Sequence, residues 1–167
     1  MSTVRLFLRP VDGTPTRADR DALLTEALGA DRFARIRILD GGKPFIASSD
    51  ADPTPPHFSI THTNGLIACA VSDVPVGIDA EPLVRSISEK LRSRILAKEE
   101  RTDDLLCTWV QKEAYLKLTG DGVRFGMANC TVADGKILDT LGRTAFVRAW
   151  KTETHTIALA SFVPIEE

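Results

Sequence analysis

The chain has 167 residues, of which 43% are hydrophobic and 26% are charged, and its formal net charge at pH 7 is -2. This length suits one domain with a sizeable core, and the composition is that of a globular protein. A charge so close to zero excludes a broadly basic nucleic-acid-binding protein. No apolar run approaches the roughly 18 residues of a membrane span, and the N-terminal run is too short for a signal peptide. We therefore expect a cytoplasmic protein that binds neither nucleic acid nor membranes.

The first part of the chain predicts a strand, a helix and a loop. Residues 3–10 (TVRLFLRP) are typical of a strand. A helical pattern begins near Thr16 and ends at Gly29. Residues 41–56 are rich in turn-forming residues and indicate a loop.

A hairpin is expected next. Residues 58–63 and 66–73 are apolar or alternating runs on either side of Asn64-Gly65, which is a favoured pair for a two-residue turn. The two runs should therefore form neighbouring antiparallel strands. Residues 74–81 (VPVGIDAE) predict the following strand.

The second part of the chain predicts two helices and then strands. Residues 87–100 and 105–120 have apolar side chains at helical spacing, and Gly120 is suited to end the second helix. Three strands are expected after it, over residues 130–138, 144–153 and 155–163. Helices followed by antiparallel strands in both parts favour an α+β fold, built as a single domain from two similar fused halves at about residues 1–81 and 82–167.

The three cysteines, Cys69, Cys107 and Cys130, are odd in number and widely separated. This pattern favours buried reduced thiols over disulfides or a zinc site.

Two carboxylates lie close together in the strand VGIDAE. Side chains alternate along a strand, so Asp79 and Glu81 share one face while the apolar Ile78 lies on the other. Like charges on a partly buried strand repel each other. Such a pair persists only when a proton, a basic side chain or a metal ion offsets the repulsion.

The second helix supplies a third acid. Trp109, Glu113 and Lys117 follow at intervals of four residues and therefore share one helical face, with Lys112 beside them. Alone, this pattern also fits a solvated Glu–Lys pair beside a half-buried tryptophan. Together with the two strand carboxylates, Glu113 would complete three oxygen ligands for one hard divalent cation, and we expect Mg²⁺.

Two further side chains are candidates for binding phosphate. His62 lies on a strand, where a single histidine is often only structural, and Lys43 in Gly42-Lys43-Pro44 also fits an ordinary surface turn. Near a metal site, however, these groups are suited to holding a pyrophosphate.

Four segments, in this order, resemble the 4′-phosphopantetheinyl transferase family. They are GKP at 42–44, FSITHT at 58–63, VGIDAE at 76–81 and WVQKEAYLK at 109–117, the last followed by Gly120 and Gly122. Each segment is short, and their order makes the resemblance specific. The paired acids and the length of the chain resemble the Sfp-like class more than the short trimeric holo-acyl-carrier-protein synthases.

The resemblance implies a Mg²⁺-dependent enzyme that transfers the 4′-phosphopantetheine arm of coenzyme A to a serine of an apo carrier protein (acyl, peptidyl or polyketide carrier). Adenosine 3′,5′-bisphosphate would be released, and we expect a monomer with its active site in the cleft between the halves. By similarity, the site has metal ligands, contacts to coenzyme A and catalytic groups. These are Asp79, Glu81 and Glu113 for the metal, Lys43, Pro44, Thr61, His62 and Lys117 for coenzyme A, and Glu113 (as base), Lys117 and His62 for catalysis.

The chain departs from the family pattern at three places. One is Ile95 and Leu96, which replace an aromatic pair common in the family and change only packing. Thr61 stands where the family usually has serine, and this change keeps a hydroxyl group. The region before GKP is short, and longer members of the family take basic contacts to the nucleotide from it. Arg17, Arg20 or Arg37 would have to replace these contacts.

Two other functions remain open from the sequence. The same three carboxylates would serve a Mg²⁺-dependent phosphohydrolase that needs no carrier protein. The chain would also fit a non-catalytic relative that binds carrier proteins or coenzyme A.

The helix expected around residues 86–98 is locally basic. It carries Lys90, Arg92, Arg94 and Lys98 against Glu89, and Arg85 precedes it. Such a run can be a merely solvated helix face, or a docking surface for the acidic carrier proteins that the resemblance implies.

Overall fold

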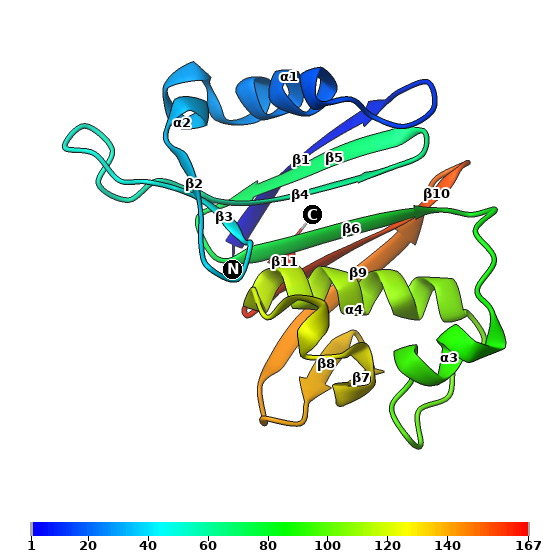
Figure 1. The fold of residues 1–167 in the computed structure, drawn as a ribbon. Helices are drawn as coiled ribbons and strands as arrows, with labels where there is room; N and C mark the ends of the chain where they lie inside the picture. The colour runs from blue at the N-terminus through cyan, green and yellow to red at the C-terminus, as the bar shows by residue number, and fades with distance from the viewer. Residues whose placement is uncertain (1, 167) are drawn as a thin grey trace.

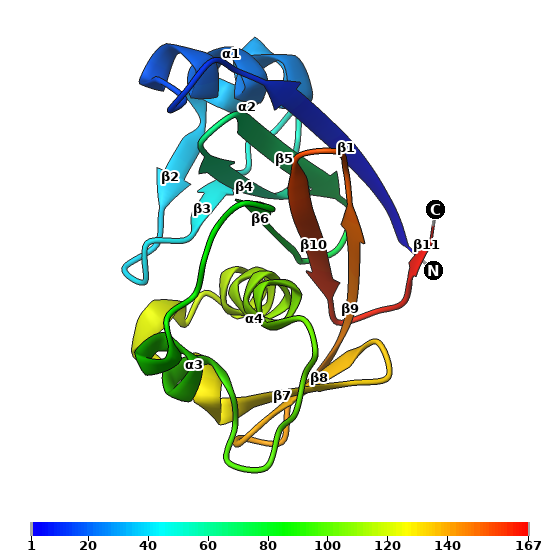
Figure 2. The same cartoon turned by 90° about the vertical axis from the view of Figure 1, so that its right-hand side faces the viewer.

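Two β-sheets pack against each other between helical layers in the computed structural model, which describes residues 2–166 (Figures 1 and 2). The first sheet carries helix α1 (Arg17–Leu28) on its outer face, and the second sheet carries helix α4 (Leu105–Thr119). Apolar side chains between the sheets form a third core. Each half thus packs a helix on a largely antiparallel sheet, which confirms the predicted α+β fold with two sheet-rich halves.

The first sheet has the strand order β11-β1-β5-β4. Its strands are β1 (Ser2–Pro10), β4 (His57–Thr63), β5 (Leu66–Ser72) and β11 (Ile165–Glu166). Strands β4 and β5 are antiparallel, with Thr63 opposite Leu66. The predicted hairpin is therefore confirmed, and Gly65 has the positive φ of 85° that such a turn favours.

Helix α1 forms where the sequence predicts it because two reciprocal hydrogen bonds, a capping box, stabilise its first turn. The Thr16 hydroxyl accepts a hydrogen bond from the Asp19 backbone N–H, and the Asp19 carboxylate accepts one from the Thr16 backbone N–H. The helix ends at Gly29. Its buried side chains, which face the sheet, are Leu23, Leu24, Ala27 and Leu28.

The predicted loop over residues 41–56 contains one short strand, β3 (Pro44–Ile46). This strand pairs with β2 (Ile36–Ile38), which follows the short helix α2 (Ala30–Ala34) in a stretch without a predicted element. Each strand has only three residues, so neither is long enough to show the alternation that reveals a strand in sequence.

The chain after β3 is fixed to α2 by one carboxylate. Asp52 accepts hydrogen bonds from Arg32 at 2.8 Å and from Arg35 at 2.6 Å. These bonds lower the pKa of Asp52 from 3.8 to about 2. Because the pKa is lower in the folded state, this carboxylate stabilises the fold above about pH 3.8, and the contribution is lost as the pH falls through about 2.

We therefore expect Asp52→Asn to lower Tm at pH 7, with a deficit that shrinks as the pH falls from 3.8 toward 2. Thermal unfolding followed by circular dichroism across this range would measure it. Asp50→Asn, at an exposed position of the same loop, is the matched control and should leave Tm almost unchanged. A deficit that is independent of pH would contradict this account of Asp52.

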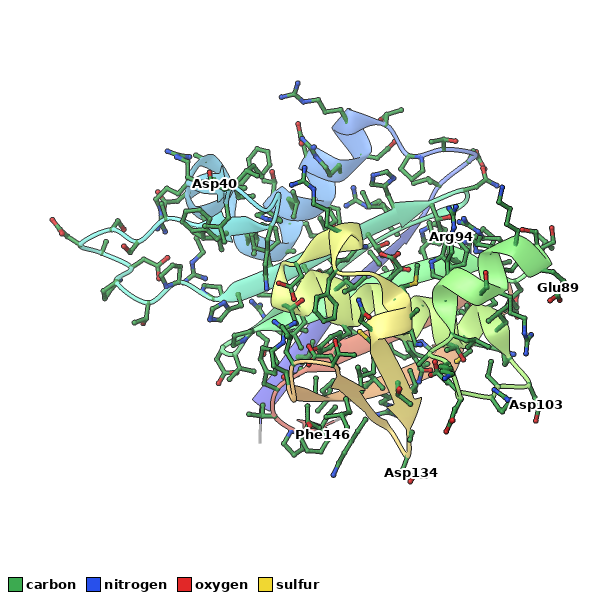
Figure 3. All side chains as sticks on the ribbon, turned by 60° about the horizontal axis from the view of Figure 1, so that its bottom comes forward. Asp40, Glu89, Arg94, Asp103, Asp134 and Phe146 are labelled. Atoms are coloured by element: carbon green, nitrogen blue, oxygen red, sulfur yellow. The ribbon has the colours of Figure 1, made fainter. Side chains whose placement is uncertain are left out.

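The second sheet has the order β6-β10-β9-β8-β7. Its strands are β6 (Val76–Pro82), β7 (Cys130–Ala133), β8 (Lys136–Asp139), β9 (Thr144–Lys151) and β10 (His155–Ser161). Residues 130–138, predicted as one strand, form a hairpin instead. Asp134 and Gly135 both have positive φ, at 49° and 70°, and make its turn, at the tip of the hairpin in Figure 3.

Strand β6 belongs to the second sheet, where it pairs with β10. The sequence-based division at residue 81 assigned these residues to the first half. In the structure the chain passes from β5 in the first sheet to β6 in the second through the turn at residues 73–75. We therefore count β6 with the second half.

The helices of the second half differ in how well they match the prediction. Helix α4 begins at the Asp104 cap and ends at Gly120, whose φ is 79°, as expected. Helix α3 (Glu89–Ile95) is shorter than the predicted 87–100, because the Ala97 backbone N–H bonds to the Glu100 carboxylate instead of continuing the helix. Two short 3₁₀ turns follow α4, namely η1 (Gly122–Arg124) and η2 (Met127–Asn129).

A buried ion pair joins α3, α4 and β7. The Lys112 side chain is completely buried and pairs with the Glu100 carboxylate. Lys112 Nζ also donates to the carbonyl oxygens of Ile95 at 2.7 Å and Cys130 at 2.6 Å. The Glu100 carboxylate accepts a further hydrogen bond from the Val132 backbone N–H. Lys112 therefore lies in the core, although its sequence position is beside the Trp109–Lys117 face.

The cysteines are free thiols, as predicted, and Cys69 and Cys130 are buried, whereas Cys107 is half-buried. Burial raises the pKa of Cys69 to about 12 and that of Cys130 to about 11, so neither is ionised at neutral pH. Within residues 2–166, no helix combines the length and the apolar character that crossing a bilayer requires.

Candidate functional site

A cavity of about 780 Å³ lies between the two halves. The first half lines it from α1, α2, β2, β3 and β4, and the second half from β6 and α4. Pockets of this size suit a small-molecule ligand. Every site residue predicted from the sequence lines this cavity: Lys43, Pro44, Thr61, His62, Asp79, Glu81, Glu113 and Lys117.

The close packing of α4 on β6 brings the acids together. A Cβ added at Gly77 would lie 2.0 Å from the Ala114 carbonyl oxygen, so only glycine allows this approach. Asp79 and Glu81 follow Gly77 on the same strand face and are directed toward α4. Helical spacing places Glu113 on the facing side of α4.

Asp79 is the most constrained of the three acids. It is 7% exposed, its Oδ1 lies 2.8 Å from Lys117 Nζ, and it accepts a hydrogen bond of 3.0 Å from the Thr61 hydroxyl. Burial nevertheless raises the pKa of Asp79, and the Lys117 charge opposes this only in part. An ionised carboxylate at this position is therefore costly without further positive charge.

Glu81 has partners of its own. Its carboxylate pairs with Arg85 and accepts a hydrogen bond from Thr63 at 3.3 Å. The Arg85 guanidinium lies 4.2 Å from the centre of the Trp109 ring, in a cation–π contact. Arg85 is thus held between an acid and an aromatic ring that both line the cavity.

Glu113 is half-buried on α4. Burial is the main cause that raises the pKa of Glu113, and the nearby charge of Asp79 raises it further. A carboxylate whose pKa is shifted toward neutrality is suited to accepting a proton.

The donor set fits a hard divalent cation in its chemistry, because three carboxylates interact electrostatically in one cavity. In residues 2–166, however, no three acidic, histidine or cysteine side chains are already arranged as a metal site. One oxygen of each strand carboxylate is engaged by a cation instead, Asp79 Oδ1 by Lys117 and Glu81 Oε1 by Arg85.

The first half contributes Lys43 and His62. Lys43 Nζ donates to the Leu118 carbonyl oxygen near the end of α4, and burial lowers the pKa of Lys43. The turn before Lys43 lies directly against α4, since a Cβ at Gly41 would be 2.8 Å from the Gly120 carbonyl oxygen. His62 is exposed at the cavity on β4.

Several cavity residues were missed by the sequence reasoning. Apolar side chains of α1, α2, β2 and β4 form one wall: Leu24, Phe33, Ile36, Ile38, Phe58 and Ile60. Their only sequence signal is hydrophobicity, which equally predicts a core. Of the three candidate arginines, Arg20 lines the cavity, although it also pairs with Asp21 at 2.7 Å. Arg17 and Arg37 do not line it; Arg17 pairs with Asp21 at 3.6 Å, and Arg37 bonds to backbone carbonyls of its own segment.

Comparison with known proteins gives consistent matches. Residues 75–163 match the family model described as the 4′-phosphopantetheinyl transferase superfamily. The chain is 33% identical over 86 residues to the 4′-phosphopantetheinyl transferase psf-1 of Bacillus pumilus, covering 45% of this chain and 36% of the relative. It is 31% identical over 116 residues to the 4′-phosphopantetheinyl transferase Sfp of Bacillus subtilis (strain 168), covering 62% of this chain and 50% of the relative. The matches thus span half or less of these relatives.

Proposed function

Because the family model matches residues 75–163, more than half of the chain, the chain belongs to the 4′-phosphopantetheinyl transferase superfamily, and we propose that it transfers phosphopantetheine from coenzyme A to a serine of an apo carrier protein. One observation carries the proposal. A single cavity brings together, from two sheets, the acids Asp79, Glu81 and Glu113 and the cations Lys43 and Lys117. Since both halves of this cavity come from one chain, we also propose that the active form is a monomer.

In the proposed reaction the serine hydroxyl attacks the phosphorus that bears the pantetheine arm. The bond to the bridging oxygen breaks, and adenosine 3′,5′-bisphosphate leaves. Mg²⁺ held by Asp79, Glu81 and Glu113 would neutralise negative charge on the pyrophosphate.

The remaining steps belong to side chains of the cavity. Glu113, which lines the same cavity, would accept the serine proton, directly or through water. Lys117, whose side chain is 33% exposed, can reach the pyrophosphate from Asp79. Lys43 and His62 would bind the phosphates of the nucleotide, and Arg20 would supply the basic contact for which the sequence offered three candidates.

The neutral cavity residues would position the nucleotide. The buried Thr61 hydroxyl, which already donates to Asp79, holds that carboxylate in place, and Pro44 fixes the strand after Lys43. The apolar wall suits the flat face of a nucleotide base.

Intact mass measurement of several apo carrier proteins tests this function. Each carrier is incubated with the protein, coenzyme A and Mg²⁺. A gain of one phosphopantetheine on any carrier would support the proposal. Release of phosphate from phosphoesters without a carrier would favour the phosphohydrolase, and binding without any mass gain would favour the non-catalytic relative.

We propose that the carrier docks on the basic surface of α3. This surface consists of Lys90, Arg92 and Arg94 on α3 and Lys98 just after it, of which all but Arg92 are exposed. Figure 3 shows α3 at the outside of the molecule, with Glu89 at its outer end. Two exposed apolar residues, Leu83 and Val84, lie in the segment of chain between Glu81 and α3.

Charge reversal on this surface should weaken carrier recognition. In Arg92→Glu with Arg94→Glu, we expect the KM for the carrier to rise about ten-fold at low ionic strength, because electrostatic attraction is replaced by repulsion. The dependence of KM on salt should weaken, while the affinity for coenzyme A stays nearly unchanged. Steady-state kinetics over a range of salt concentrations would measure both effects.

The matched control reverses Arg5 and Arg17, which are exposed on the first half. It changes the net charge equally and should leave the carrier KM nearly unchanged. If both double variants behave alike, the carrier docks elsewhere.

A further inference from the structure

Two cations hold the strand carboxylates of the cavity. Lys117 Nζ lies 2.8 Å from Asp79 Oδ1, and Arg85 pairs with Glu81 Oε1. The contact with Trp109 fixes the Arg85 guanidinium from a second side. Lys117 lies on α4, so its pair with Asp79 depends on the packing of α4 on β6, whereas Arg85 lies four residues after Glu81, in the turn that follows β6.

Glu113, the third carboxylate of the cavity, interacts with the same four charges. The charges of Lys117 and Arg85 act on Glu113 in the direction opposite to those of Asp79 and Glu81. With all five groups ionised, the cluster carries one net negative charge. A divalent cation needs anionic oxygen atoms, so the two ion pairs oppose the binding of Mg²⁺ by their positive charge and by engaging one oxygen atom of each strand carboxylate.

We propose that Arg85 and Lys117 make Mg²⁺ binding depend on the diphosphate of coenzyme A. This inference rests on the proposed function, because it takes coenzyme A as the co-substrate. A diphosphate carries negative charges that attract both cations, and their movement frees oxygen atoms of Asp79 and Glu81 for the metal. Coenzyme A thereby frees the carboxylate oxygen atoms that Mg²⁺ needs, and Mg²⁺ frees the two cations that the diphosphate attracts. Linkage then requires that the two affinities rise by the same factor.

Titration calorimetry with each ligand tests the coupling. For the wild-type protein we expect Mg²⁺ to bind at least about ten-fold more tightly when coenzyme A is saturating than when it is absent. The affinity for coenzyme A should rise by the same factor when Mg²⁺ is saturating. Equal Mg²⁺ affinity with and without coenzyme A would overturn the inference.

Arg85→Gln should change this coupling in a specific way. Without coenzyme A the variant should bind Mg²⁺ more tightly than the wild type, by about five-fold, because Glu81 has lost its counter-cation. The coupling factor should fall accordingly. Arg101→Gln is the matched control, since it removes one exposed arginine outside the cavity. If Arg85→Gln binds Mg²⁺ no better than this control, Arg85 does not have the proposed role.

Trp109 offers a second readout that needs no turnover. The chain has two tryptophans, so a Trp150→Phe background leaves Trp109 as the only one. Because Trp109 lines the cavity, the probe is inorganic pyrophosphate, which has no aromatic base. Pyrophosphate with Mg²⁺ should change the Trp109 fluorescence as Arg85 leaves the ring, and Arg85→Gln should weaken this change. An unchanged spectrum in the Trp150→Phe protein would contradict movement of Arg85.

Inorganic pyrophosphate separates this inference from the proposed function. If pyrophosphate strengthens Mg²⁺ binding through Arg85 while no carrier protein gains mass, the coupling stands and the transferase proposal fails. If carriers are modified but neither coenzyme A nor pyrophosphate changes the Mg²⁺ affinity, only the coupling fails.

Discussion

Asp79→Ala is expected to lower kcat for phosphopantetheine transfer by about 10²–10³-fold or more, because the variant loses an anionic metal ligand and the charge stabilisation that depends on it. Its requirement for Mg²⁺ should also shift to higher concentrations. The fold should persist. Burial already raises the pKa of Asp79, so the ionised carboxylate is costly to the folded state, and the partly exposed Lys117 can turn to solvent.

Transfer kinetics over a range of Mg²⁺ concentrations and thermal unfolding would separate these effects. We expect Tm to stay near the wild-type value or to rise. Asp73→Ala, at an exposed position in the turn before β6, is the control and should retain activity. Wild-type kcat in Asp79→Ala at limiting Mg²⁺ would refute the assignment of Asp79 as a metal ligand.

The largest effect on stability is expected at Lys112. Lys112→Met should lower the free energy of unfolding by about 3–5 kcal/mol, because it leaves the Glu100 carboxylate buried without its cation and removes the donor to two carbonyl oxygens. This is a large share of the roughly 5–15 kcal/mol that stabilises a typical domain. Urea unfolding followed by circular dichroism would measure the loss.

The partner variant distinguishes a broken ion pair from lost packing. Adding Glu100→Gln to Lys112→Met should cost less than the sum of the two single changes, because no uncompensated charge remains. Lys98→Met, at an exposed position, should change the free energy of unfolding by no more than about 0.5 kcal/mol. A wild-type unfolding curve for Lys112→Met would show that this pair does not hold α3, α4 and β7 together.

The elements predicted correctly carry strong local signals. The capping box at Thr16 and Asp19 defines the start of α1, Gly120 ends α4, and Asn64-Gly65 defines the β4–β5 turn. The errors arose where local signals are short or ambiguous. Strands β2 and β3 have three residues each, and the hairpin at residues 134–135 lies inside a run that also fits one strand.

The candidate site shows the same division. Strand and helix periodicity placed Asp79 with Glu81, and Glu113 with Lys117, on faces that the structure brings to one cavity. The partner of each charge could not be predicted in this way. Lys112 has the same sequence character as an exposed helical lysine, and Arg85 lies in a turn without periodicity, so tertiary packing alone decides that one is buried and the other stacks on a ring.

The contact at Gly77 sets a dimension of the molecule. The backbone of β6 touches the backbone of α4 there without an intervening side chain. The distance between α4 and β6 is therefore set by a contact between main-chain atoms, and not by the volumes of the surrounding apolar side chains. Any side chain at this position would push α4 away from β6. The separation between the strand acids and Glu113 is thus set by Gly77, and substitutions elsewhere in the core should leave this separation unchanged.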